Sequence, residues 1–275
     1  MFIHLDTCRE LLGIISEHSS LTHDEAFKQY GNKVSNAAIY HKFKDSQMKY
    51  SLTDGECGIA AALLPAASDN AEVRCYCDQV AGQCAAFIHD PQTFADFKDR
   101  SADPYALDQG ISGMGIYMSL YNERFPLPTT ELALQNIASD LRQNLSESAD
   151  GKRELSIADW KYVAAFFAVY GRQHPDYAND ARRILHAIDH QHKFQFTNLR
   201  WGVAGLLVLA TFLHDRPLIR KYRQLLLASG SYRGNTMVWP LPGQVYLTND
   251  YFLDGTSGIY WALMYSLNVS DEILQ

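Results

Sequence analysis

Three short stretches of the sequence carry residue types that could bind a metal ion or catalyse a reaction. The first contains Cys75, Cys77 and Cys84, which are close enough in the sequence to suggest a metal cluster. Two of them also fit a helical pattern of apolar residues, which consists of Val73, Cys77, Val80, Cys84 and Ile88. The two thiols of a helical C-x-C pair point apart. We therefore predict an amphipathic helix in which Cys77 and Cys84 are core residues rather than metal ligands.

The second stretch, HAIDHQHKF, places His186 and His190 four residues apart, with His192 beyond them. This spacing allows two imidazole rings on one helix face to share a metal ion. The stretch ends an amphipathic segment, however, and positive charge is favourable at the end of a helix. We predict a solvated end of an outer helix here.

The third stretch, LRWGVAGLLVLATFL from Leu199, places Arg200 and Trp201 directly before a glycine that opens an apolar helix. Three more segments share the design of Leu, one to three residues, Gly, two residues, Gly and an apolar run: LTDGECGIAAALL, LDQGISGMGIYMSL and LDGTSGIYWALMYSL. Their leading glycines, separated by 55, 92 and 53 residues, are Gly55, Gly110, Gly202 and Gly255. Intervals of this size indicate a tandem structural repeat, and the long middle interval has room for a disguised unit.

The elements that position these residues are predicted to be helices of two kinds. The apolar half of each repeat is hydrophobic nearly all round, which is typical of a buried helix. Amphipathic segments lie between them, such as TTELALQNIASDLRQNLSE, and PLIRKYRQLLLASG with a C-cap at Gly230. Strand-like alternation is scarce apart from TMVWPLPGQVYL. An inner ring of buried helices inside an outer amphipathic ring, an all-α α/α toroid of five to seven hairpins, is the economical arrangement.

We expect one domain over residues 1–275, with N-terminal helices in 1–50 and the glycine repeats in 51–275. Each glycine pair is expected to allow close backbone approach and to leave free N–H groups facing a central cavity. The alternative is that the glycines only permit tight packing. In either case the residues just before them should line the mouth of the cavity.

The glycine segments resemble those of the lanthionine synthetase C-like family, the cyclases of lanthipeptide biosynthesis. DGTSGIYWALMYSL looks like the last glycine repeat of that family, and SLTDGECGIAAALL looks like its D-G-x-S-G-I repeat. The resemblance covers roughly residues 50 to 268 as spaced motifs. It implies an α/α toroid and a reaction in which zinc activates a cysteine thiol that adds to a dehydrated Ser or Thr. Free-standing members of the family are usually longer than this chain.

Two positions that the resemblance marks as functional lie in the first half of the chain. Asp54 matches the aspartate of the family's D-G-x-S-G repeat. Gln109 stands in DQGISG where the next repeat of the family has a histidine before the glycine. The resemblance therefore implies that one of these two positions is retained and the other is changed.

The three positions at which the family binds zinc have all changed. In ADWKYVAAFFAVY, the best match to the family's W-C-Y-G stretch, Trp160 and Tyr162 match and Lys161 replaces the cysteine. Arg200 and Trp201 stand where the family has C-H before the glycine. Because two of the replacements are cations, which repel Zn²⁺, we expect no metal and no other cofactor at this site.

Thioether formation without zinc is then the preferred hypothesis. A Lys or Arg side chain favours the thiolate form of a nearby thiol, so Lys161 and Arg200 could stabilise a thiolate or an enolate oxyanion. Tyr162 or Asp54 could donate the proton, and Gln109 could orient the peptide. The expected partners are a precursor peptide and the companion dehydratase, kinase or lyase enzymes that modify it.

A non-catalytic protein is the first alternative. Trp160, Lys161, Arg200 and Trp201 would form a cationic, aromatic cavity that binds a peptide carboxylate. The segment RGNTMVWPLPGQVYLTNDYF could be a lid whose Trp239 and Tyr246 contact the ligand, or equally a packed connection.

A carbohydrate-active enzyme is the second alternative, because paired carboxylates serve glycoside chemistry. The candidate carboxylates near the inner-helix starts are Asp54, Asp108, Asp159, Asp250 and Asp254. For Asp159 and Asp254, capping of a helix is the simpler role. Asp254 is also a candidate substrate-binding residue at the cavity mouth.

The charge and the apolar pattern exclude several function classes. The net charge of −7 argues against nucleic acid or an anionic membrane as the main partner. No apolar run reaches the ~18 residues that a membrane span requires. Because MFIHLDTCREL carries charges where a secretory peptide is apolar, a cytoplasmic location is expected.

Overall fold

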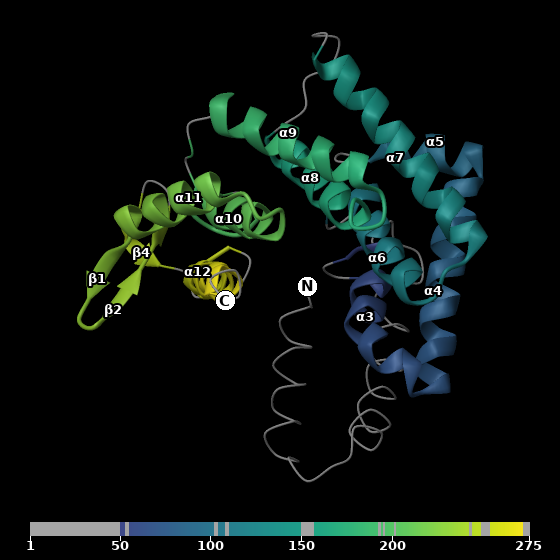
Figure 1. Ribbon diagram of the computed structural model, residues 1–275, viewed down its shortest axis with the longest axis horizontal. Helices are drawn as coiled ribbons and strands as arrows, with labels where there is room; N and C mark the ends of the chain where they lie inside the picture. Colours follow the sequence, from purple (N-terminus) through teal and green to yellow (C-terminus); the bar gives the residue numbers. More distant parts are fainter. Residues whose placement is uncertain are drawn as a thin grey trace. The chain divides into compact units, whose positions relative to one another are not determined.

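The computed structural model describes residues 50–52, 55–101, 104–107, 110–149, 157–191, 194, 196–200, 202–241, 244–248 and 254–271. The chain divides into two compact units, residues 1–155 and 156–275, and each is described by itself (Figure 1). The described residues are mostly helical, which confirms the predicted all-α fold. Short strands lie only between the last two helices of this part of the chain. None of the described helices is long and apolar enough to cross a membrane.

The first unit consists of helices that pack around α6 and α4. Its described elements are α3 (Glu56–Leu63), the 3₁₀ helix η2 (Leu64–Ser68), α4 (Ala71–His89), α5 (Pro91–Arg100), α6 (Ile111–Arg124) and α7 (Pro128–Ala149). Helix α3 packs against α4 and α6, and α7 packs against the same two helices. Most side chains of α6 are buried, whereas α7 buries one stripe that includes Leu134, Ile137 and Leu141. These two helices show the predicted pairing of a buried with an amphipathic helix.

Helix α4 follows the predicted apolar pattern. Asn70 caps its start, because the Asn70 side chain accepts hydrogen bonds from the N–H groups of Glu72 and Val73 at 2.9 and 3.1 Å. All five residues of the predicted stripe are buried: Val73, Cys77, Val80, Cys84 and Ile88. This confirms that Cys77 and Cys84 are core residues.

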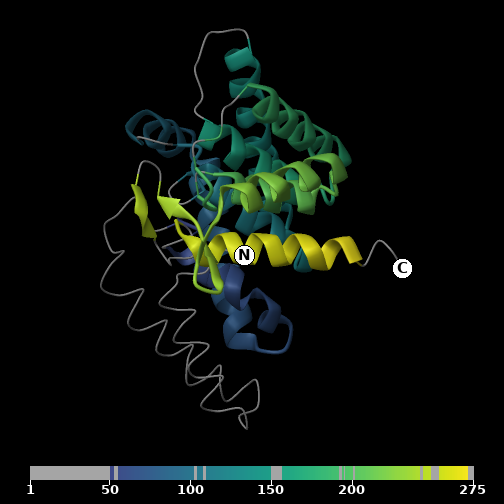
Figure 2. The same cartoon turned by 90° about the vertical axis from the view of Figure 1, so that its left-hand side faces the viewer.

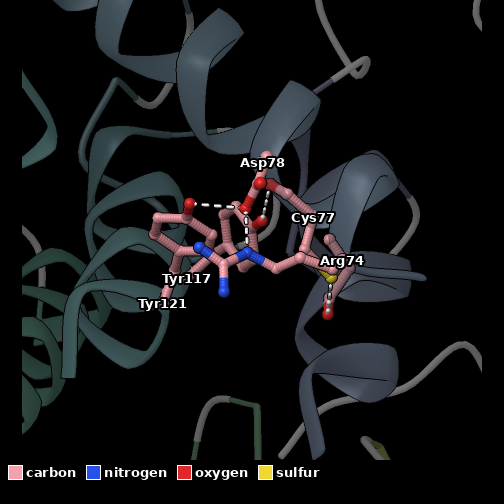
Figure 3. A network of polar contacts seen from close by, with 6 residues as sticks. Arg74, Cys77, Asp78, Tyr117 and Tyr121 are labelled. Atoms are coloured by element: carbon pink, nitrogen blue, oxygen red, sulfur yellow. Dashed lines mark hydrogen bonds and ion pairs between the residues drawn. The ribbon is translucent and has the colours of Figure 1, made fainter. Parts of the chain in front are cut away.

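A partly buried polar network connects α4 to α6 (Figure 3). The Arg74 Nε is 2.5 Å from the Asp78 carboxylate, and Tyr121 of α6 donates its hydroxyl to the same carboxylate at 2.6 Å. The Arg74 guanidinium also lies 3.4 Å from the centre of the Phe125 ring. Tyr117 of α6 donates to the carbonyl of Cys77 at 2.7 Å. These contacts fix α6 against the middle of α4.

The second unit repeats the pairing of buried and amphipathic helices. Its described elements are α8 (Ile157–Tyr170), α9 (Pro175–Gln191), α10 (Val203–Phe212), α11 (Arg216–Ser229), β1 (Ser231–Arg233), β2 (Thr236–Val238), β3 (Pro240–Leu241), β4 (Gln244–Thr248) and α12 (Thr256–Asp271). Helices α8 and α9 lie side by side, as do α10 and α11 (Figure 1). A buried helix beside an amphipathic one is the repeating element of the predicted α/α toroid. Helix α8 lies in the long middle interval and is largely buried, as expected of the disguised unit.

Two features of the second unit refine the sequence predictions. Helix α11 does end at Gly230, but the backbone there is extended and leads into the antiparallel pair β1–β2. Helix α12 lies along α10 (Figures 1 and 2) and is not buried on every side as its apolar sequence predicts. Its contacts with α10 and α11 involve one face, and Tyr260, Met264 and Leu267 on another face are exposed.

Candidate functional site

The candidate site of the second unit is built on the loop in front of α10, residues 196–200 and 202. The loop folds back across the helix start, so that the N–H of Val203 donates to the carbonyl of Phe196 and the N–H of Ala204 to that of Thr197, both at 3.1 Å. Gly205 allows this approach, because a Cβ at Gly205 would lie 2.3 Å from the carbonyl oxygen of Leu199. The glycine pair therefore seats a loop on the first turn of the helix.

The same backbone arrangement occurs in the first unit at the start of α6. There the N–H of Ile111 donates to the carbonyl of Pro104 at 2.9 Å, and a Cβ at Gly113 would lie 2.0 Å from the carbonyl oxygen of Leu107. The expectation of free N–H groups facing a cavity is therefore wrong for the groups named here. Carbonyls seven residues upstream accept their hydrogen bonds, because the chain turns back over its own helix.

Lys161 of α8 binds the loop in front of α10 from the side. Its side chain is 6 % exposed, and its Nζ donates to the carbonyl of Leu199 at 3.2 Å and to the carbonyl of Arg200. The hydroxyl of Tyr162, which is 5 % exposed, donates to the Arg200 carbonyl at 3.4 Å. The two neighbouring residues of α8 thus satisfy the backbone acceptors of the loop.

The protonation of Lys161 follows from its burial. Loss of hydration and, to a lesser extent, the nearby Arg200 guanidinium together lower the pKa of the Lys161 amine from 10.5 to about 7. The Asp254 carboxylate raises the pKa of Lys161, but its effect is weaker. The backbone carbonyls compensate part of the cost of burying the amine, because each accepts a hydrogen bond from it.

The Arg200 side chain reaches the start of α12. Its Nε lies 3.3 Å from the carboxylate of Asp254, which directly precedes Gly255 of the last glycine motif. The two side chains are 27 % and 42 % exposed, but the Arg200 Nε itself is buried and makes no hydrogen bond with the carboxylate. The structure therefore brings together four of the predicted site residues, namely Lys161, Tyr162, Arg200 and Asp254.

The other predicted site residues divide into two groups. Trp160 is half-buried in the first turn of α8, beside Lys161 in the sequence. Trp239 is 3 % exposed; its indole N–H donates to the carbonyl of Leu226 at 2.7 Å and its ring packs edge-on against Tyr260. These contacts are typical of a packed connecting segment, which was the alternative to a lid. Asp54, Gln109 and Trp201 lie outside the described residues, as does the side chain of Tyr246.

The residues at this site do not fit a zinc ion. Zinc in proteins is bound by thiolate, imidazole and carboxylate ligands, whereas the buried position here holds an amine that already donates to two carbonyls. In the described part of the chain, no three His, Cys, Asp or Glu side chains come together in a group suited to a metal ion. His186, on the exposed side of α9 as predicted, instead pairs with Asp215 at 2.8 Å between Nε2 and Oδ2.

The sequence did not indicate which contacts each site residue makes. Lys161 was considered for contact with a thiolate or enolate, but its hydrogen bonds go to backbone carbonyls. The ion pair between Arg200 and Asp254 was not anticipated either. A signal for it exists in the sequence, since each residue directly follows the leucine of its glycine motif, Leu199 or Leu253, and opposite charges at equivalent repeat positions can pair.

Comparisons with known proteins add one structural similarity. No family model matches the chain, and no curated protein matches it. A solved structure entitled "Nisin cyclase" is similar, with 13% sequence identity over 94% of this chain and 86% of that chain and a TM-score of 0.45.

Proposed function

We propose that the protein binds a ribosomally made precursor peptide and closes a thioether ring in it without zinc. The observation that carries this proposal is the pairing of two partly exposed side chains, Arg200 and Asp254, with Arg200 held in front of α10 by the hydrogen bonds from Lys161 and Tyr162 to its carbonyl. The resemblance of the glycine motifs to those of lanthipeptide cyclases supplies the class of substrate. The proposal includes the closed α/α toroid that the resemblance implies.

In the proposed reaction, a cysteine sulfur of the peptide attacks the β-carbon of a dehydrated Ser or Thr. The new C–S bond forms as the π electrons of the C=C bond move towards the carbonyl, which gives an enolate. The Arg200 guanidinium, a delocalised cation with five N–H donors, is suited to hydrogen-bond the enolate oxygen. The thiol proton passes to a base and a proton returns to the α-carbon, so that no atom is gained or lost.

Asp254 is the described residue suited to the proton transfer, because its carboxylate lies beside Arg200 and is partly exposed. In this proposal Lys161 and Tyr162 are positioning residues, since their polar atoms contact the loop backbone. The roles that the resemblance implies for Asp54 and Gln109 in this reaction remain predictions.

The experiment is a cyclisation assay with a synthetic peptide that carries one dehydroalanine and one cysteine. Alkylation adds mass to peptides whose cysteine is still free, so mass spectrometry separates them from cyclised peptides. The rate of the uncatalysed addition is subtracted. Loss of one donor to a developing oxyanion slows such reactions by about 100-fold or more, so Arg200→Met should lose ring closure to that extent. Arg200→Lys keeps the positive charge but lacks the planar set of N–H donors, so this variant should retain an intermediate rate. Equal rates for wild type and Arg200→Met would contradict the proposal.

A second candidate function is peptide binding without catalysis. It is favoured by the partly exposed side chain of Arg200, whose guanidinium is suited to bind a peptide carboxylate. Fluorescence anisotropy with a labelled peptide separates the two functions. Binding that weakens with salt and with Arg200→Met, but without turnover above the uncatalysed rate, would favour the binding protein.

A further inference from the structure

Two fully buried cysteines of the first unit lie with their sulfur atoms in contact. Cys57 is on α3 and Cys84 is on α4, and the distance between their Sγ atoms is 3.5 Å. Both residues have no exposed surface. Cys77, also buried, instead donates to the carbonyl of Ala60 at 3.6 Å, and Cys75 is exposed. The Cys57–Cys84 pair is therefore distinct in geometry from the other described cysteines.

The sequence places these two thiols opposite each other for identifiable reasons. Cys57 lies between the two glycines of the first motif, on the first turn of α3. Cys84 belongs to the apolar stripe of α4, and α3 packs against α4. The bond length of a disulfide is about 2.05 Å, so each sulfur would need to move by less than about 1 Å to close the remaining gap. A rotation about the side-chain torsions can supply such a movement.

We propose that Cys57 and Cys84 form a site of reversible oxidative modification, at which a small peroxide converts the two thiols into a disulfide. One thiolate attacks a peroxide oxygen, which gives a sulfenic acid and releases water or an alcohol. The second thiol then displaces the hydroxyl group as water and forms the S–S bond. The two sulfurs lose two electrons, and the peroxide gains them. Thiol exchange with an added dithiol reverses the modification.

Burial sets the rate of this reaction. It raises the pKa of the Cys57 thiol well above its ordinary value, and the hydrogen bond with Cys84 acts in the same direction. Since the thiolate is the reactive form, oxidation should be slow and restricted to small oxidants. Any sulfenic acid should be captured at once, because the second sulfur is already in contact with the first. The disulfide would fix the start of α3, and with it the first glycine motif, to the middle of α4.

The experiment oxidises the wild-type protein with increasing hydrogen peroxide, alkylates the remaining thiols under denaturing conditions and maps the peptides by mass spectrometry. The expected result is a cross-linked peptide that joins Cys57 to Cys84 and disappears after treatment with a dithiol. Exposed Cys75 should react first and shows that the oxidant is active. Separate sulfinic acids at Cys57 and Cys84, or oxidation of Cys75 with no cross-link, would overturn the proposal.

Two variants test the assignment of the pair. Cys84→Ala should abolish the cross-link, whereas Cys77→Ala, a matched change at another buried cysteine of α4, should leave it intact. A cross-link from Cys57 to Cys77 in the wild type would also contradict the proposal. The wild-type map stands on its own if either variant fails to fold, and none of these measurements depends on the proposed cyclisation.

Discussion

The loops in front of α6 and α10 have the same backbone arrangement but different chemistry. In both, a glycine lets the chain cross the first helical turn, and a carbonyl seven residues upstream accepts a helix N–H. At α10 the loop carbonyls also accept hydrogen bonds from Lys161 and Tyr162, and the loop carries Arg200, which pairs with Asp254 in front of α12. The glycines thus determine the conformation of the repeat, whereas the residues around them determine what each copy can bind.

Substitution of a glycine that allows the shared conformation is expected to have the largest effect on the free energy of unfolding. Gly113→Ala would place a Cβ 2.0 Å from the carbonyl oxygen of Leu107, so the backbone must shift. We expect the free energy of unfolding to fall by about 3 kcal/mol, the upper end of the usual range for overpacking. Chemical denaturation measures this change.

The matched control is Gly82→Ala in the middle of α4, where an added Cβ has no atom within 4 Å. This change should raise the free energy of unfolding by about 0.5–1 kcal/mol, because alanine favours the helix. Equal effects of the two substitutions would show that close approach of the loop does not explain the glycine motif.

The difference between the two loops can be tested at Lys161. Lys161→Met leaves the carbonyls of Leu199 and Arg200 without the amine, so near pH 10.5, where burial of the amine carries little cost of deprotonation, the free energy of unfolding should fall by about 1–3 kcal/mol. Lys221→Met is the comparison, because Lys221 is exposed and pairs with Asp189 at the surface. That change should cost about 0–1 kcal/mol. If denaturation gives equal losses, Lys161 does not support the loop.

The pH dependence of stability provides a separate test of Lys161. Its pKa is about 7 in the folded protein against 10.5 for an ordinary lysine, so the unfolded chain binds more protons between these values. The contribution of Lys161 to stability should therefore rise as the pH increases from about 7 towards 10.5. The wild type should gain stability relative to Lys161→Met over pH 7 to 9.5, below the ordinary pKa of tyrosine near 10. A constant difference would show that the amine keeps its ordinary pKa.

Substitution in the Arg200–Asp254 ion pair is expected to have the smallest effect on the free energy of unfolding. Because solvent reaches both Arg200 and Asp254, Asp254→Asn should change the free energy of unfolding by no more than about 1 kcal/mol. The same substitution should strongly reduce cyclisation of the dehydroalanine peptide if Asp254 transfers the proton. A stability loss as large as that of Lys161→Met would indicate a structural rather than a functional pair.

The helical fold was predictable because its signals are local. The stripe on α4 and the apolar runs of α6, α8 and α10 each follow from residue spacing along one segment. The exposed face of α12 was not predictable in this way, since an apolar run does not show which of its sides finds a neighbour.

The candidate site was only partly predictable, because its decisive contacts join residues that are far apart in the sequence. The glycine motifs located Arg200 and Asp254, but their ion pair depends on how α10 and α12 pack. The type of Lys161 indicated a cation at the site. Its use as a donor to two carbonyls depends on the path of a loop that starts 35 residues later, at Phe196.

The central claim, ring closure supported by the Arg200 cation in place of zinc, is tested most directly by one measurement. The rate of thioether formation in the dehydroalanine peptide is compared before and after the protein is treated with a zinc chelator and dialysed. The account predicts the same rate above the uncatalysed reaction in both samples. A rate that falls to the uncatalysed level after chelation and returns when Zn²⁺ is added would contradict it.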